Sequence, residues 1–243
     1  MLLTGYIALV VAAGGVALWG IGAPDPTVGG LSLLFWLLAN LLGEVLWLPA
    51  PKGRGYLSMA NAANFATLIL LPASPAIAVT AGAGLVADLL FRRRKWYQAL
   101  FNSAACALTV GAASMVFAKS GGTSSSIEAI LSPLNAIPLF LAGLTYFLLN
   151  TWLISGVVAL HQKESVWTVW RTSFAFPYEM VGAVVLKLLG YLFAILFLTW
   201  GYMSAFLAVI ATYFIRDAYM RYVAQSEAAP QIGAPTADRR PTS

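Results

Sequence analysis

The stretch that decides the fold runs from residue 58 to residue 95 and reads SMANAANFATLILLPASPAIAVTAGAGLVADLLFRRRK. It contains two apolar runs, at about 58–72 and 74–91, followed at once by four basic residues. Pro72 and Pro75 separate the runs, and a proline lacks the N–H of a helical hydrogen bond and crowds the preceding turn. The stretch therefore predicts two membrane helices with a break between them.

The first of these helices is short for a full crossing. Two arrangements stay open, because the segment can cross a locally thinned bilayer or form a re-entrant hairpin with the helix that follows. In both arrangements residues 58–91 return the chain to the side from which it started. Six further apolar segments flank this stretch, at about 2–20, 31–49, 97–118, 134–160, 173–196 and 200–218.

The composition agrees with a membrane protein. Of the 243 residues, 60% are hydrophobic and 9% are charged, whereas a soluble domain has roughly 25% charged residues. At roughly 20 residues per crossing, we predict an all-α fold, a polytopic transmembrane bundle of about 6–8 crossings. The bundle occupies residues 1–225, and the polar, Pro- and Ala-rich residues 226–243 are predicted to form a disordered cytoplasmic tail.

The basic residues predict the orientation. Twelve of the 14 Lys and Arg residues fall on one side of this map, the exceptions being Lys119 and Lys187. Because cytoplasmic loops carry an excess of Lys and Arg, both termini are predicted to be cytoplasmic, in the inner membrane of a bacterium. The net charge of +5 is thereby explained by contact with the bilayer, and no nucleic-acid partner is expected.

Polar residues inside apolar segments need a reason, because a central charge costs about 2.5–3.5 kcal/mol on insertion scales. They gather in the cytoplasmic half and predict a polar, ligand-binding cavity there. Interhelical hydrogen bonding is the alternative reading, especially for the asparagines. The candidate residues are Asn40, Glu44, Asn61, Asn64, Asn102, Asn150, Glu179 and Lys187.

Charged partners follow from the same map. Glu179 and Lys187 lie about 12 Å apart along one helix, so Lys187 is expected to pair with a carboxylate on another helix, with Glu44 as the candidate. Asp88 is expected to pair with the adjacent arginines. The basic cluster itself is interpreted as a topology determinant that contacts lipid headgroups, and its members are Arg92, Arg93, Arg94 and Lys95.

Known catalytic and metal-binding patterns are absent from the sequence. His161 is the single histidine and Cys106 the single cysteine, so no metal site is expected. No nucleotide-binding loop or nucleophile elbow occurs. We therefore expect no cofactor and no catalytic residues.

A family resemblance rests on residues 58–102, ending RRRKWYQALFN, and on YFLLNTWLISGVVAL at 146–160. These stretches resemble the multi-helix membrane modules that precede HD-GYP or GGDEF domains in bacterial cyclic-dinucleotide signalling proteins. The resemblance covers roughly residues 40–172 and implies a sensory or ligand-binding module. We expect no signalling domain after the last helix, so a partner protein would supply the output. The helix entering the basic cluster is also similar, more faintly, to the substrate-binding subunits of energy-coupling-factor vitamin transporters.

The sequence thus favours a non-enzymatic inner-membrane sensor or ligand-binding module for an unidentified small molecule. A small-molecule transporter, or the substrate-binding subunit of one, is the first alternative. A membrane enzyme that acts on a lipid, with Glu44 or Glu179 as acid or base, is the second, although no catalytic motif accompanies these carboxylates.

Overall fold

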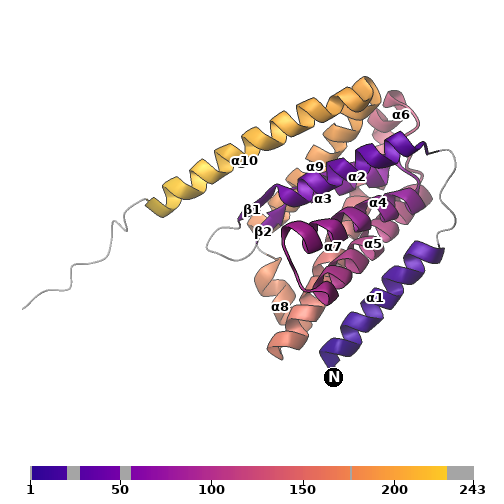
Figure 1. The fold of residues 1–243 in the computed structure, drawn as a ribbon. Coiled ribbons are helices and arrows are strands. Elements are labelled where there is room, and N and C mark those ends of the chain that lie inside the picture. Colours follow the sequence, from indigo (N-terminus) through magenta and orange to yellow (C-terminus); the bar gives the residue numbers. More distant parts are fainter. Residues whose placement is uncertain (1, 21–27, 50–55, 176, 229–243) are drawn as a thin grey trace, which may run out of the picture.

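The computed structural model of the chain describes residues 2–20, 28–49, 56–175 and 177–228. The fold is a bundle of helices (Figure 1), which confirms the predicted all-α class. Helices occupy all eight predicted apolar segments: α1 (Leu2–Gly20), α2 (Gly30–Val45), α3 (Ala60–Leu70), α4 (Ala73–Val86), α5 (Trp96–Lys119), α7 (Ala136–Gln162), α9 (Pro177–Trp200) and α10 (Ser204–Ala228).

Short elements that the sequence did not predict join these helices. Two three-residue strands, β1 (Trp47–Pro49) and β2 (Tyr56–Ser58), pair antiparallel between α2 and α3. A π-helical segment, η2 (Ala87–Phe91), extends α4. The others are α6 (Ile127–Leu131), η3 (Pro133–Asn135), α8 (Val166–Ser173) and η4 (Gly201–Met203).

Helix α8 lies beside the end of α7 with a stack of tryptophans between them. Ser165 caps α8, since its hydroxyl accepts a hydrogen bond from the Thr168 N–H at 3.5 Å. Trp167 and Trp170 of α8 stack at 5.5 Å between ring centroids, and Trp170 stacks on Trp152 of α7 at 5.9 Å. Tryptophans prefer the membrane–water interface, so this corner fits the headgroup level at the predicted cytoplasmic ends.

Among the described residues, five helical stretches are long and apolar enough to cross a membrane: Leu2–Gly20, Ala73–Phe91, Trp96–Lys119, Pro133–Gln162 and Met180–Leu207. Helices α2 and α3 are also apolar but shorter. Helix α3 has 11 residues, so it rises about 16 Å against a hydrocarbon core of about 30 Å. Residues 63–69 are all buried, because α2, α4, α5 and α9 pack around them. Helix α3 is thus a half-length helix enclosed by longer ones, and it turns into α4 at Pro72.

The hydrophobic core lies around α3. Trp36 of α2 is fully buried and packs on Phe193 and Phe197 of α9, with ring centroids 5.2 and 5.0 Å away. Close approach of α9 to α3 requires Gly190, because a Cβ there would lie 2.5 Å from the carbonyl oxygen of Ala62.

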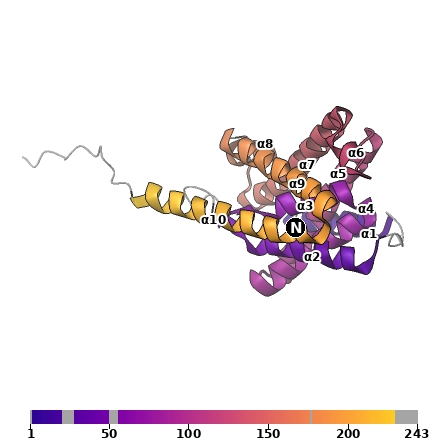
Figure 2. The same ribbon diagram turned by 90° about the horizontal axis from the view of Figure 1, so that it is seen from above.

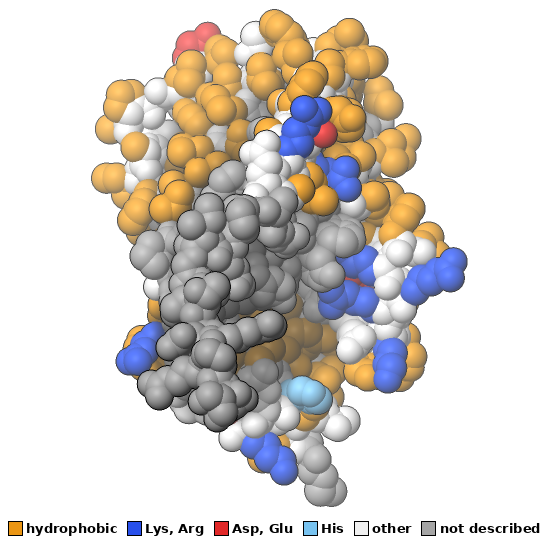
Figure 3. Space-filling model, turned by 90° about the vertical axis from the view of Figure 1, so that its left-hand side faces the viewer, with side chains coloured by type: hydrophobic (Ala, Val, Ile, Leu, Met, Phe, Trp, Pro, Cys, Tyr) orange, Lys and Arg blue, Asp and Glu red, His pale blue; other side chains and the backbone are white. Residues whose placement is uncertain are grey.

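Helix α10 leaves the bundle, as Figures 1 and 2 show from two directions. It contacts α9, η4 and β1. The helix continues to Ala228, three residues past the predicted end of the helical domain, and the tail predicted from residue 229 onward lies outside the described residues. On the face shown in Figure 3, hydrophobic side chains predominate in the upper part, and most Lys, Arg and His side chains lie toward the centre and bottom. The number of crossings and the orientation of the termini stay predictions.

Candidate functional site

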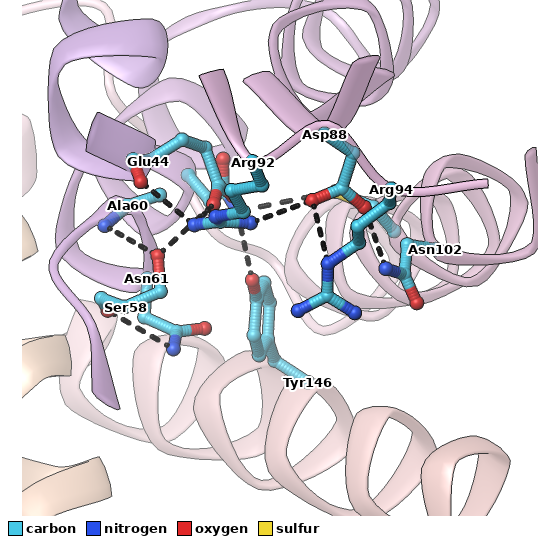
Figure 4. A network of polar contacts seen from close by, with 11 residues as sticks. Glu44, Ser58, Ala60, Asn61, Asp88, Arg92, Arg94, Asn102 and Tyr146 are labelled. Atoms are coloured by element: carbon cyan, nitrogen blue, oxygen red, sulfur yellow. Dashed lines mark hydrogen bonds and ion pairs between the residues drawn. The ribbon is translucent and has the colours of Figure 1, made fainter. Parts of the chain in front are cut away.

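An ion network joins the ends of four helices at the predicted cytoplasmic side of the bundle (Figure 4). Its centre is Arg92, the residue after η2. The Arg92 guanidinium donates to Glu44 Oε2 at 2.6 Å, to the Glu44 carbonyl oxygen at 2.7 Å and to Asp88 Oδ1 at 2.9 Å. Glu44 lies in the last turn of α2, so this one side chain ties α2 to the end of α4.

Asp88 is the most enclosed member of the network, with 2% of its side chain exposed. It also accepts a hydrogen bond from Asn102 Nδ2 of α5 at 2.6 Å, and Arg94 Nε lies 3.3 Å from its Oδ1. The predicted pairing of Asp88 with adjacent arginines is therefore confirmed. Arg92 and Arg94 were expected to contact lipid headgroups, but both are directed to this buried carboxylate.

The backbone after α4 explains how two arginines reach one aspartate. The helix widens to a π-turn over Ala87–Phe91, and the Arg92 N–H donates to the Ala87 carbonyl oxygen at 3.0 Å. Arg93 then adopts a φ of +49°, in the left-handed region that non-glycine residues rarely enter. This residue reverses the chain, so the Arg94 N–H donates to the Asp88 carbonyl oxygen at 2.8 Å. Backbone strain of this kind clusters at functional and switching sites.

The other side of the network is the start of α3. Ser58 donates from Oγ to Glu44 Oε2 at 3.2 Å, and Ser58 Oγ in turn accepts a hydrogen bond from the Ala60 N–H at 3.2 Å. Asn61 donates to the Ser58 carbonyl oxygen at 3.3 Å. Gly43 permits this contact, because a Cβ there would lie 2.7 Å from the Cα of Ala60.

The network is balanced in charge, with two carboxylates and two guanidinium groups. Burial lowers the pKa of Arg92, but the attraction of Glu44 and hydrogen bonds to Asp88 and Glu44 outweigh it and raise that pKa above its ordinary value. Arg92 therefore stays charged at any physiological pH. Both carboxylates accept hydrogen bonds from side-chain donors.

A second polar group lies deeper in the bundle. Asn64 of α3 donates to the Tyr146 hydroxyl of α7 at 3.0 Å and lies 3.9 Å from Cys106 Sγ. The ammonium of Lys187 lies 3.6 Å from the centroid of the Tyr146 ring and 5.5 Å from that of Phe65. These are cation–π distances.

The predicted pairing of Lys187 with Glu44 is wrong. Glu44 pairs with Arg92, and no ion pair found in the described ranges includes Lys187. The physical reason is depth, since Lys187 is the eleventh residue of α9 and lies about 15 Å along its axis from the start of the helix, the predicted cytoplasmic end. Glu44 lies in the last turn of α2, where the arginine is nearer.

The remaining candidate residues are scattered. Asn40 is fully buried and donates to Thr67 Oγ1 at 2.8 Å and to the Trp36 carbonyl oxygen at 2.7 Å, which is the interhelical bonding that the sequence left open. Asn150 is partly buried on α7 and makes none of the described hydrogen bonds. Glu179 lies in the first turn of α9, but its side chain is outside the described residues.

Two cavities are described, and apolar side chains line most of both. One, of about 600 Å³, lies between α7 and α9, and Lys187 is the sole member of the candidate set that lines it. The other, of about 570 Å³, lies among α2, α3, α9 and α10, and none of the candidate residues lines it. The structure thus divides the predicted set into the ion network, the Tyr146 group and isolated positions. In the part of the chain that the structure describes, no three His, Cys, Asp or Glu side chains form a group that could hold a metal ion.

Sequence reasoning missed several members of these groups. Arg92 was expected to pair with Asp88, and the i, i+4 spacing of these two residues fits that pair, but its pairing with Glu44, which lies at the same predicted depth, was not expected. Ser58 and Tyr146 gave no signal, since neither residue type stands out in a membrane sequence and their partners are far away along the chain.

These features define a multi-pass helical membrane protein whose helix ends are joined by a buried ion network. A sequence model of the MASE9 family matches residues 55–217, which is more than half of the chain. The chain therefore belongs to the MASE9 family of membrane-associated sensory domains. The match confirms the membrane sensory part of the resemblance. Neither the curated proteins nor the solved structures contain a match.

Proposed function

We propose that the chain is a non-enzymatic sensor of the bacterial inner membrane, which binds a small molecule among its helices and reports to a signalling domain or partner protein in the cytoplasm. HD-GYP or GGDEF domains are the expected output, in line with the resemblance of residues 40–172. The observation that carries the proposal is the ion network, which joins the ends of α2, α3, α4 and α5 on the side where an output domain would lie.

Such a network suits a switch. A buried, charge-balanced cluster adds little net stability, because desolvation offsets the attraction between its charges. It does specify one arrangement of the helix ends, and a ligand that favours a different arrangement can shift the population between two states. The strained Arg93 marks the point where α4 would be released.

The route outward is short. Two residues separate Glu44 from β1 (Trp47–Pro49), and β1 contacts α10. A change at the network therefore reaches the last described helix through one strand. Because α10 contacts few other elements, it is free to change its angle to the bundle.

The lipid-enzyme alternative has less support. A general acid or base must reach the proton that it transfers, but Glu44 and Asp88 are both committed to donors. Glu179 is untested. Among the described residues, no contact or cavity specifically favours the transporter alternative.

The test measures the position of α10 when the network is broken. In a chain whose native cysteine is replaced by alanine, spin labels go on exposed Thr168 of α8 and exposed Gln225 of α10. Pulsed electron–electron spectroscopy then compares the parent with Arg92→Met and with Arg93→Met as the matched control. We expect a second distance population in Arg92→Met alone.

Two results contradict the proposal. If Arg92→Met leaves the distance distribution of the parent unchanged, the network does not control α10. If the unmodified chain in sealed vesicles moves solutes by itself, transport replaces sensing as its function.

A further inference from the structure

Lys187 is a cation with unused binding capacity inside a membrane span. It lies in the stretch Met180–Leu207, which is long and apolar enough to cross a bilayer. Its ammonium contacts the faces of Tyr146 and Phe65, but none of the described hydrogen bonds or ion pairs uses its three N–H donors. A charge at this depth is a functional-site hypothesis by default, and its natural complement is an anion.

The cavity beside Lys187 is an apolar groove between α7 and α9. Its volume of about 600 Å³ falls in the range of small-molecule sites, about 300–1,000 Å³. Phe140 of α7 is 67% exposed, and Val184 and Leu188 of α9 are 59% and 56% exposed, although all three line the groove. The groove therefore opens on the surface of the bundle at membrane depth, and an occupant enters from the lipid.

The groove extends from Met180 of α9, on the cytoplasmic side of Lys187, to Ser132 and Pro133, which lie just before the start of α7. Lys187 thus lies along its length, with apolar wall on both sides. A long apolar chain fits this shape, and a negatively charged group on that chain would meet the ammonium.

We propose that this groove binds a long-chain fatty acid, whose carboxylate pairs with Lys187 and whose hydrocarbon chain lies between α7 and α9. A fatty acid is favoured over an anionic phospholipid by depth. Lys187 lies about 15 Å along α9 from its cytoplasmic start, where a bulky phosphate headgroup would be taken from the interface into hydrocarbon. A carboxylate is small enough to reach it and keeps two acceptor oxygens for the ammonium.

This inference names the ligand of the proposed sensor, so the sensory role of the bound fatty acid rests on the proposed function. Binding itself is measured without reference to α10. If the chain binds the fatty acid but α10 does not move when the network is broken, the proposed function alone is defeated. If α10 moves but the chain does not bind the fatty acid, this inference alone is defeated.

The experiment uses the full chain in nanodiscs of phosphatidylcholine. The probe is hexadecanoic acid with a photoreactive diazirine in its chain, and cross-linked peptides are located by mass spectrometry. Competition by unlabelled hexadecanoic acid is compared with competition by hexadecanol, which has the same chain length and no charge. We expect cross-links on the groove-lining parts of α7 and α9, and competition by the acid at concentrations about tenfold or more below those of the alcohol.

Matched variants test the charge and the groove separately. Lys187→Met should weaken acid binding by about ten- to a hundredfold, the effect of one charge-assisted hydrogen bond, and leave alcohol binding unchanged. Lys119→Met removes a cation from the exposed end of α5 and should bind as the parent does. Val184→Trp should fill the groove and abolish labelling. Val185→Trp, the control, changes an exposed neighbour that does not line the groove.

Several outcomes would overturn the inference. Equal competition by acid and alcohol would show an apolar slot without charge recognition. Cross-links spread over all lipid-facing helices would show partition into the bilayer only. Displacement of the probe by phosphatidylglycerol as effectively as by the acid would assign the groove to a phospholipid. Because Val184 is on the surface, its replacement tests the groove even if Lys187→Met fails to insert.

Discussion

Replacing Arg92 with methionine tests how much the ion network holds the helix ends together. The change removes three charge-assisted hydrogen bonds, to two oxygens of Glu44 and one of Asp88. Methionine keeps the apolar stem, so packing changes little. The perturbation is therefore almost purely electrostatic.

The magnitude follows from what each partner retains. Removing one member of a buried ion pair costs about 3–5 kcal/mol when its partner is left uncompensated. Here Asp88 keeps Arg94 and Asn102, and Glu44 keeps Ser58. The Arg92 side chain is also 23% exposed, so water screens part of the interaction. We expect the free energy of unfolding to fall by about 2–3 kcal/mol.

The assay is equilibrium unfolding by sodium dodecyl sulfate in mixed micelles, followed by the fluorescence of the eight tryptophans. The thiol reactivity of the single cysteine, which lies within α5, supplies a second probe, and coincidence of the two transitions checks that unfolding has two states. Arg93→Met is the control. It removes the same charge one residue away, but Arg93 is exposed and makes none of the described ion pairs.

A double-mutant cycle gives the result that would refute this reasoning. If Arg92 acts through Glu44, Arg92→Met should cost at least about 0.5 kcal/mol less in a Glu44→Gln background than in the parent. Equal costs in the two backgrounds, or a loss in Arg93→Met as large as that in Arg92→Met, would mean that the network does not join α2 to α4.

Two other predictions address packing and topology. Gly190→Leu should destabilise the chain by about 1–3 kcal/mol in the same unfolding assay, because the new side chain overpacks against α3. The control is Gly182→Leu on the same helix, which has nothing within 4 Å of its missing Cβ and should cost under about 0.5 kcal/mol. Equal losses of stability in the two variants would contradict the close α3–α9 contact. Topology is tested in a chain whose native cysteine is replaced by alanine. An impermeant maleimide should label Ser120→Cys from the periplasmic side and Ser165→Cys from the cytoplasmic side, because both serines are exposed and the Lys and Arg distribution predicts opposite sides. Labelling of both cysteines from one side would refute the predicted orientation.

Much of the fold follows from the sequence alone. Runs of apolar residues bounded by Pro72, Pro75 and the basic cluster mark the helices, because backbone groups in lipid must bond within their own helix. The apolar run at residues 58–72 was expected to be short for a full crossing, and the helix that forms there, α3, has 11 residues. What the runs do not contain is the neighbour of each helix, so the central position of α3 was not predictable.

The site was harder to predict, for a related reason. Sequence position fixes how deep a residue lies, since each residue adds about 1.5 Å along a helix, but not the direction in which it points across the bundle. Glu44 had two possible cations, Arg92 and Lys187, and the choice between them depends on how α2 packs against α4. The i, i+4 pairing of Asp88 with Arg92 needs one helix only, and the predicted partnership of Asp88 with the arginines was confirmed.

The ion network and Lys187 differ in whether their charges have counter-charges, and α3 lies between them. The network contains its own counter-charges, so it needs no ligand, whereas Lys187 lines the groove and takes part in none of the described ion pairs. Tyr146, which lies under the Lys187 ammonium, accepts a hydrogen bond from Asn64 of α3. One turn earlier on α3, Asn61 bonds to Ser58, whose hydroxyl bonds to Glu44 of the network. A carboxylate that draws Lys187 away from the Tyr146 ring would therefore act first on α3, the short helix that begins two residues after Ser58, the last residue of β2. This places the proposed ligand contact and the ion network one turn apart on one buried helix, which is short enough to move as a unit within the longer helices around it.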